Sequence, residues 1–294
     1  MIWKDVNARY VREGELLIDF GLIGDWWTEL SSMNHKKIGQ PYEYPPSFIR
    51  WCSLLRTVLH LPYRQLEGLI KGLSKYMPLP SVPSFRTLWR RIKELGLDII
   101  KGMASPKENL IIAVDSTGIK VTNRGEWVRH KWKVRKGWLK LHIAVDIKSH
   151  NAIRFYLTPE NTGDATIGEY FLEEISKKNR LKRFLGDGAY GTYGIFEKCD
   201  EKKIEAGIRV RKDARRKPLK APLRTKTIDT QREDWDYWRT SLDFGQRWQS
   251  ESYFSSYKRR FGEVVKAKTW RTIIQEITQN VRTLNWLIKK RCES

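Results

Sequence analysis

The stretch LIIAVDST, residues 110–117, is an apolar run that ends at Asp115. An uninterrupted run of this length is typical of a strand buried on both faces of a sheet. A carboxylate at the end of such a strand is costly unless a metal ion or hydrogen bonds compensate it. Because Ser-Thr-Gly follows, an aspartate that only accepts hydrogen bonds from turn amides fits the same pattern.

Further strand and helix patterns follow this run. Two strand patterns form an expected hairpin around residues 149–151, and strands and helices then alternate. This order predicts a mixed α/β sheet flanked by helices. The expected strands are WLKLHIAVDIKS (138–149), AIRFYLTP (152–159), RFLGDGAY (183–190) and IEAGIRVR (204–211), with a helix at TIGEYFLEEISKKN (166–179) and another short helix before residue 204.

Asp187 repeats the arrangement of Asp115, because the apolar pair Phe184-Leu185 leads into Gly186-Asp187-Gly188. The flanking glycines permit unusual backbone angles and the close approach of another group. A simple turn would also use them, so neither aspartate is decisive by itself.

A third carboxylate, Glu251, lies in a helical region expected from about residue 232 to 261. At about 100° per residue, Phe244, Arg247, Glu251 and Lys258 fall within about 60° of one another on a continuous helix. One helical face therefore presents an acid, two bases and an aromatic ring. An exposed face with ion pairs is the alternative interpretation.

Together the three carboxylates favour a metal site. Mg²⁺ prefers oxygen ligands, and two such ions promote in-line phosphoryl transfer. We therefore expect Asp115, Asp187 and Glu251 to be catalytic metal ligands for two Mg²⁺ ions, which Mn²⁺ can replace. Arg247 and Lys258, one and two turns from Glu251, would contact phosphate.

The same residues resemble a known family. The order Asp, Asp, Glu is similar to that of the DDE transposases of prokaryotic insertion sequences, which have an RNase H-like core. Phe244-x2-Arg247-x3-Glu251-x6-Lys258 keeps three of the four positions of their Tyr-x2-Arg-x3-Glu-x6-Lys signature. Phe244 lacks the hydroxyl of that tyrosine. AVDSTG and GDGAYG, around Asp115 and Asp187, also resemble the family's aspartate motifs.

The resemblance implies a transposase that binds the ends of its insertion sequence, cleaves DNA strands and transfers them into target DNA. Its partners would be double-stranded DNA, as element ends and target, and a second copy of the chain when ends are paired. Two alternatives stay open: a metal-dependent nuclease without strand transfer, and a catalytically idle DNA-binding regulator.

Three short helices are expected between residues 45 and 95, each starting at a proline or serine: FIRWCSLLRTVLHL, YRQLEGLIKGL and FRTLWRRIKEL. A helix-turn-helix-like domain fits this pattern, as does a small bundle with a solvated basic face. We assign residues 1–105 to a helical DNA-binding region and 106–294 to the RNase H-like catalytic domain, with a basic insertion near 209–230. The stretch 209–226 is expected to be extended. The expected DNA-binding residues of the third helix are Arg86, Arg90, Arg91 and Lys93.

Composition supports a nucleic-acid partner. The 294 residues include 56 Lys and Arg against 34 Asp and Glu, a formal net charge of +22, which favours a polyanionic partner. The 40% hydrophobic content allows a packed core. No apolar stretch is long enough to span a membrane and no signal-like N-terminus is visible, so we expect a soluble protein of the prokaryotic cytoplasm and nucleoid. Three distant cysteines suggest neither disulfides nor zinc.

Several other residues compete for functional roles. Asp146 also ends an apolar strand, but we expect it to accept turn amides. Asp164 is expected to cap a helix, and Glu263 to face away from the Glu251 stripe. His142 is expected to be a core histidine. Trp127, Trp132 and Trp138, interleaved with basic residues, fit either base stacking or ordinary packing.

Overall fold

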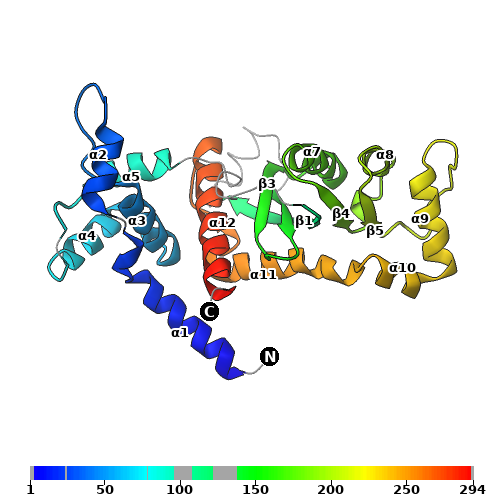
Figure 1. Cartoon of the computed structure of the whole chain (residues 1–294), viewed down its shortest axis with the longest axis horizontal. Coiled ribbons are helices and arrows are strands. Elements are labelled where there is room, and N and C mark those ends of the chain that lie inside the picture. The colour runs from blue at the N-terminus through cyan, green and yellow to red at the C-terminus, as the bar shows by residue number, and fades with distance from the viewer. Residues whose placement is uncertain (1–2, 24, 78, 96–107, 122–137, 293–294) are drawn as a thin grey trace. The chain divides into compact units, whose positions relative to one another are not determined.

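The computed structural model describes residues 3–23, 25–77, 79–95, 108–121 and 138–292 (Figure 1). Contacts divide the chain into two units. The first comprises Met1–Leu97 with Ile277–Ser294, and the second comprises Asp98–Glu276. We call them the helical unit and the sheet unit. The stretch with Trp127 and Trp132 lies outside the described residues.

The sheet unit contains a mixed sheet with the order β3-β2-β1-β4-β5. Strands β1 (Leu110–Val121), β2 (Trp138–Asp146) and β3 (Ala152–Pro159) form an antiparallel meander. Strand β4 (Leu181–Gly186) pairs parallel to β1, and β5 (Glu205–Ile208) pairs parallel to β4. This topology confirms the predicted RNase H-like mixed sheet.

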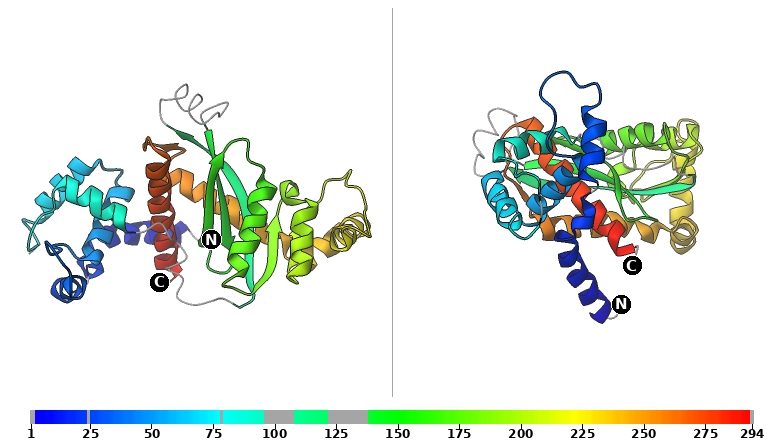
Figure 2. Two further views of the ribbon diagram at one scale, coloured as in Figure 1. Left: turned by 90° about the horizontal axis from the view of Figure 1, so that it is seen from above. Right: turned by 60° about the vertical axis from the view of Figure 1, so that its left-hand side comes forward.

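Helices cover both faces of this sheet (Figure 2, left). Helices α7 (Asp164–Ser176) and α8 (Tyr193–Glu201) share one core with the even-numbered β1 residues Ile112 and Val114. Helix α11 (Trp248–Phe261) packs against β1 and β2. Because strand side chains alternate, the odd-numbered residues of β1, Asp115 among them, point away from the α7–α8 core.

Among the described residues, the helical unit contains the three predicted helices, two α-helices and a 3₁₀ turn before them that the patterns did not predict, and part of a long helix near the C-terminus. Its core is built from apolar residues of α2, α3, α4 and α5. The Ser53 hydroxyl donates to the Gln279 side chain (3.0 Å), and the Arg282 guanidinium donates to the Leu95 carbonyl (2.9 Å), so the second part of α12 belongs to this unit. The helices are α1 (Trp3–Leu17), the 3₁₀ turn η1 (Phe20–Leu22), α2 (Trp26–Asn34), α3 (Pro46–Val58), α4 (Tyr63–Leu73), α5 (Phe85–Glu94) and α12 (Trp270–Cys292).

The stretch 209–226, which was expected to be extended, is helical in its last part. Pro222 begins helix α9 (Pro222–Glu233), a position where proline costs no hydrogen bond. The Arg224 guanidinium donates to the carbonyls of Gly191 (3.1 Å) and Arg215 (3.0 Å), so part of the basic charge holds the preceding loop in place. This prediction was wrong for residues 222–226.

The helical region expected from 232 to 261 is divided into separate elements. Asp234 caps α10 (Trp235–Ser241) by accepting a hydrogen bond from the Tyr237 amide. Asp243 has a left-handed backbone (φ 46°), which no continuous helix accommodates. The 3₁₀ turn η4 (Phe244–Arg247) and α11 follow.

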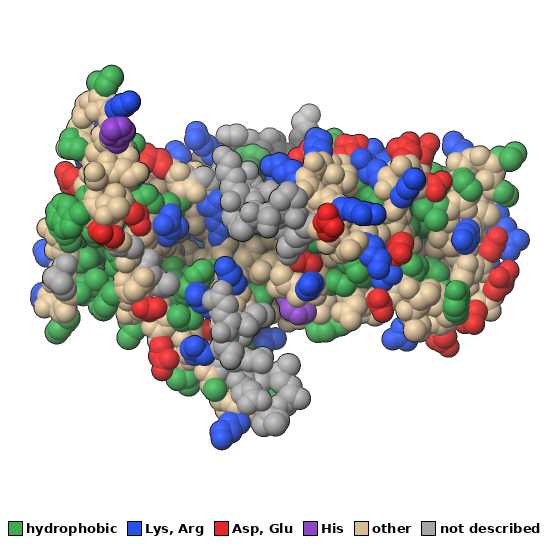
Figure 3. Space-filling view, viewed as in Figure 1, with side chains coloured by type: hydrophobic (Ala, Val, Ile, Leu, Met, Phe, Trp, Pro, Cys, Tyr) green, Lys and Arg blue, Asp and Glu red, His purple; other side chains and the backbone are tan. Residues whose placement is uncertain are grey.

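On the face in Figure 3, Lys and Arg side chains of the described residues alternate with Asp and Glu instead of forming one continuous basic surface. No described helix is long and apolar enough to cross a membrane.

Candidate catalytic and DNA-binding site

Asp115 lies within β1, which continues to Val121, and Asp187 directly follows the neighbouring parallel strand β4. Ala113 on β1 is in register with Leu185 on β4, and each aspartate lies two residues beyond its member of that pair. Because side chains alternate along a strand, both aspartates continue the face on which Ala113 and Leu185 lie. The sheet therefore brings the two predicted aspartates side by side although 72 positions separate them in the sequence.

The Asp115 carboxylate is held in an unfavourable environment. Its oxygen accepts a hydrogen bond from the Ser116 amide (2.8 Å). Burial and the negative charges of Asp187 and Glu251 nevertheless raise the pKa of Asp115 to about 6. A bound cation would relieve this repulsion.

Asp187 begins the turn that follows β4. Its carboxylate accepts a hydrogen bond from the Ala189 amide (2.9 Å) in the 3₁₀ turn η3 (Gly188–Tyr190). The end of the predicted strand at 183–190 is thus a turn, which leaves Asp187 at the carboxyl edge of the sheet beside Asp115.

Glu251 lies in the first turn of α11, and its carboxylate forms an ion pair with the guanidinium of Arg247. Arg247 already has α-helical backbone angles (φ −55°, ψ −30°), so the expected spacing from Arg247 to Glu251 is preserved. Phe244 does not share this helix. Its ring packs against Trp238 (4.8 Å) and Trp235 (6.1 Å) as part of an aromatic cluster.

Lys258 forms an ion pair with Glu263, a residue that the sequence pattern had placed on another face of the helix. Its ammonium lies 3.0 Å from the Glu263 carboxylate. Glu263 was expected to face away, but α11 ends at Phe261 and Gly262, at φ 78°, redirects the chain. A glycine after a helix is the usual sign of such an ending.

The three carboxylates are neighbours but do not form a closed ligand set. Among the described residues, no three His, Cys, Asp or Glu side chains lie close enough together to hold a metal ion. The carboxylate oxygens of all three residues are the kind of ligand that a hard divalent cation prefers. The negative charges of Asp187 and Glu251 also act on Asp115 and raise its pKa. In this structure the Glu251 carboxylate pairs with Arg247 instead.

The competing residues have structural partners. Asp146 is buried and accepts from the Lys148 amide (3.1 Å) and the Ser149 hydroxyl (2.6 Å), as predicted. Asp164 does not cap α7, whose cap residue is Gly163. It lies 3.2 Å from the Lys140 ammonium and 3.4 Å from Nδ1 of His142. His142 is completely buried and contacts the Thr158 hydroxyl (2.8 Å), as expected of a core histidine.

The basic side chains of helix α5 differ in exposure to solvent. Arg86 and Arg90 are exposed, and the Lys93 ammonium lies 4.7 Å from the Trp89 ring. Arg91 is buried, donates to the Tyr44 carbonyl (3.1 Å), and lies over the Tyr42 ring. Its guanidinium therefore stabilises the helical unit and is not available to DNA in this structure.

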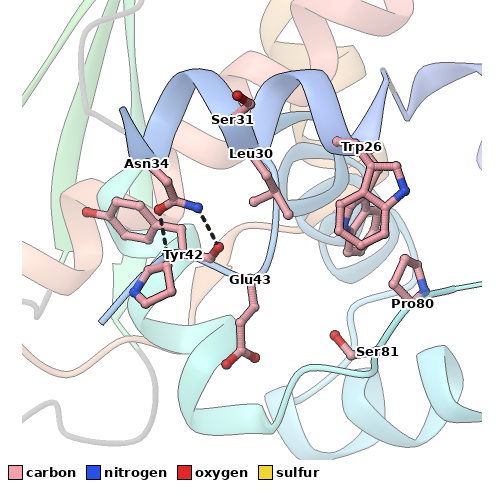
Figure 4. A pocket seen from close by; sticks show the side chains of 10 residues that line it. Trp26, Leu30, Ser31, Asn34, Tyr42, Glu43, Pro80 and Ser81 are labelled. Carbon is pink, nitrogen blue, oxygen red and sulfur yellow. Dashed lines mark hydrogen bonds between the residues drawn. The ribbon is translucent and has the colours of Figure 1, made fainter. Parts of the chain in front are cut away.

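The helical unit also contains a cavity of about 580 Å³ (Figure 4). The Asn34 side chain closes one end by hydrogen bonds with both the amide and the carbonyl of Tyr42 (2.7 and 3.0 Å). None of the predicted site residues lines this cavity. The lining residues are Trp26, Trp27, Leu30, Ser31, Asn34, Pro41, Tyr42, Glu43, Pro80 and Ser81.

The strand order is that of an RNase H-like sheet, and it brings Asp115 and Asp187 side by side. Residues 106–286 match the family model described as the transposase DDE domain, and residues 11–124 match a second model with the same description. The chain therefore belongs to the DDE transposase family, whose members bind DNA and cleave and join it with divalent metal ions.

A solved structure to which the chain is similar is described as the cryo-EM structure of a piggyBac transposase synaptic complex with hairpin DNA. The comparison has 10% sequence identity and a TM-score of 0.44, and it covers 94% of this chain and 73% of that chain.

Proposed function

We propose that this transposase binds the ends of its insertion sequence, cleaves strands there and joins them to target DNA at one site formed by Asp115, Asp187 and Glu251. The observation that carries this proposal is the register of β1 and β4, which aligns Asp115 with Asp187, with Glu251 near enough to affect the Asp115 pKa. Carboxylates that repel one another are tolerated where a cation is to be bound.

Mg²⁺ is the proposed physiological ion, with two ions per site and Mn²⁺ as a substitute. Bound there, the ions would polarise the phosphate and lower the pKa of an attacking hydroxyl or water. The chain itself supplies the orientation: β1 fixes Asp115, the η3 turn fixes Asp187, and α11 carries Glu251.

Arg247 and Lys258 are the proposed phosphate contacts next to the acids. Both cations now pair with carboxylates, Arg247 with Glu251 and Lys258 with Glu263. A DNA phosphate offers a competing anionic partner for each. When Arg247 turns to phosphate, Glu251 is released towards the two aspartates, so DNA binding favours assembly of the site.

Residues 1–105 are proposed to bind the element ends, and 106–294 to carry the chemistry. Arg86, Arg90 and Lys93 of α5 are the proposed contacts, while Arg91 is left out because it is buried. The exposed basic residues between 209 and 221 provide a second surface for the phosphate backbone. Pairing two ends requires two active sites, so we propose a homodimer on DNA, associated with the nucleoid.

The test is a cleavage and joining assay on DNA that carries the inverted repeats flanking the coding region. We expect Mg²⁺-dependent cleavage, lost in Asp115→Ala while end binding is retained. Persistence of cleavage in that variant would refute the site. Cleavage without joining to a second duplex would identify a nuclease, and binding without cleavage by the unaltered protein would identify a regulator.

A further inference from the structure

Arg183 lies on β4, four residues before Asp187. Side chains alternate along a strand, so Arg183, Leu185 and Asp187 share one face of the sheet. Phe184 belongs to the core on the opposite face, beneath α7 and α8. The turn η4 packs against β4 and β1, and α11 packs against β1 and β2. The strand that leads to Asp187 therefore also carries a guanidinium on the side where Arg247 and its neighbours lie.

The Arg183 side chain is buried and donates hydrogen bonds to three groups. Nε donates to the carboxylate of Glu205 (2.6 Å), its cross-strand neighbour on β5. Nη1 donates to the Leu242 carbonyl (2.8 Å) and to the Asp243 carboxylate (2.9 Å). A buried charge is costly unless it is paired and hydrogen-bonded, and charge-assisted contacts of this kind are the strong ones. The guanidinium is thus fixed on β4 and fixes what it contacts.

Leu242 and Asp243 form the corner between α10 and η4. Asp243 has a left-handed backbone (φ 46°). Aspartate tolerates this conformation better than most residues, but the surroundings still have to hold the backbone in it. The Asp243 carbonyl accepts a hydrogen bond from the Gln246 amide (2.8 Å), which joins the corner directly to η4. Arg183 therefore contacts the point at which the chain changes direction.

The backbone from this corner to Glu251 is short and helical. The turn η4 covers Phe244–Arg247, and α11 follows it without a break, because Arg247 has α-helical backbone angles. Glu251 lies eight residues after Asp243. The direction in which the chain leaves the corner therefore decides where Arg247 and Glu251 lie relative to Asp187.

A purely stabilising ion pair between β4 and β5 would need only Glu205. The other two contacts of Arg183 reach residues 59 and 60 positions further along the chain. The first turn of α11 has a second anchor, since the Gln249 side chain contacts Nδ1 of His150 in the turn between β2 and β3 (2.7 Å). Loss of Arg183 would accordingly free the start of this segment while the rest of α11 stays packed.

We propose that Arg183 is a positioning residue for Glu251 and Arg247. Its guanidinium fixes the Leu242–Asp243 corner on β4 and so sets the start of the helical run that carries both side chains. One strand then positions two of the three carboxylates, Asp187 through its own backbone and Glu251 through Arg183. The inference rests on the proposed function of Glu251 as a metal ligand and names a residue outside the three carboxylates.

The first experiment measures hydrogen exchange in the metal-free protein without DNA. In Arg183→Met, the amides of residues 244–251 should exchange about tenfold faster, because the corner has lost two hydrogen bonds. Glu205→Gln is the matched control, since it changes a carboxylate on the same guanidinium and leaves the corner contacts in place. Unchanged exchange of residues 244–251 in Arg183→Met, or an equal increase in Glu205→Gln, would overturn the proposal.

Asp243→Asn provides a second variant in case Arg183→Met does not fold. Asparagine also tolerates the left-handed backbone, so the substitution weakens the contact with Arg183 and keeps the corner. Exchange of residues 244–251 should increase in the same direction by a smaller factor. No increase in a folded Asp243→Asn protein would count against the clamp.

The second experiment separates positioning from a general loss of stability. Cleavage by Arg183→Met should show a kcat lower by on the order of ten- to hundredfold, with KM for end DNA unchanged, because a displaced site still binds DNA. Arg154→Met removes another arginine–glutamate pair, that of β3 with Glu174 on α7, and should keep its kcat. An equal fall in kcat in Arg154→Met would show that Arg183 only stabilises the fold.

The third experiment asks whether Arg183 acts through Glu251. Mn²⁺ titration calorimetry without DNA should give a dissociation constant about tenfold higher in Arg183→Met, and no further increase when Arg183→Met is added to Glu251→Gln. Additive losses would overturn the coupling. Unchanged Mn²⁺ affinity in Glu251→Gln would refute the proposed function instead, while hydrogen exchange of residues 244–251 would still test the contact of Arg183 with the corner.

Discussion

The Lys258 ammonium lies 3.0 Å from the Glu263 carboxylate, across the glycine that ends α11. The positive charge of Lys258, the last residue of the Arg-x3-Glu-x6-Lys pattern, is therefore partly neutralised in the absence of DNA. Glu263 is half exposed, so the pair is weak, on the order of 0–1 kcal/mol.

Glu263→Gln should consequently strengthen DNA binding by about two- to fivefold at low salt, because Lys258 no longer has to leave an acidic partner. The dependence of log K on log salt should change little, because Lys258 contacts one phosphate in both proteins. Fluorescence anisotropy at several salt concentrations measures both. Glu233→Gln makes the same charge change at an exposed position of α9, and an equal gain there would mean that net charge alone is responsible.

Asp115→Asn should abolish cleavage yet stabilise the metal-free protein at pH 7. The folded-state pKa of Asp115 is raised from 3.8 to about 6, so the folded protein binds this proton more tightly than the unfolded chain. Stability therefore falls as pH rises from about 4 to about 6, and stays lower above it. We expect a gain of about 1–3 kcal/mol in the free energy of unfolding at pH 7.

Urea unfolding in a chelator at pH 7 and pH 4 checks this expectation, because the advantage of Asp115→Asn should shrink at the lower pH. Mg²⁺ should stabilise the unaltered protein more than the variant. An advantage of equal size at both pH values would contradict the electrostatic explanation.

His142 should produce the opposite pH dependence. Burial lowers its pKa from 6.5 to about 4, so the unfolded chain binds this proton first. The contribution to stability is complete above about pH 6.5 and is lost as pH falls towards 4. His142→Gln, which keeps a donor for Thr158, should remove about 2 kcal/mol of this acid-induced loss. Unfolding of both proteins at pH 7, 5.5 and 4.5 gives the difference, and parallel curves would exclude His142 as the titrating group.

Phe244→Ala should destabilise the segment that leads into α11. The ring packs on Trp238 and Trp235 and is only half buried, so we expect a loss of about 1–3 kcal/mol. Cleavage at saturating Mg²⁺ should fall because Arg247 and Glu251 follow directly. Phe244→Tyr should keep the packing, and a similar loss in that variant would show that the site depends on more than the ring.

The sheet and the three short helices were predictable because their signals are local. The apolar run before Asp115, the hairpin around residues 149–151 and the prolines at helix starts each act within a few residues. Asp187 follows a strand end as the pattern suggested, whereas β1 continues beyond Asp115 to Val121, because the residues after Asp115 still pair with β2.

Other features depend on contacts that are distant in sequence or on single backbone angles. Arg91 has the same charge and helix as Arg90, but only the fold shows that the Tyr44 carbonyl lies next to it. The left-handed backbone at Asp243 interrupts an otherwise helical pattern. Asp164 was expected to cap a helix because nothing nearby in the sequence indicates Lys140 or His142 as its partners.

The helical unit is discontinuous in sequence, since residues 277–294 complete what residues 1–97 begin. Engineering by domain exchange must respect this interruption. A transplant of the first 105 residues alone would leave Ser53 without Gln279 and the Leu95 carbonyl without Arg282. A chimaera with another helical unit therefore needs both segments, exchanged together around an unchanged sheet unit.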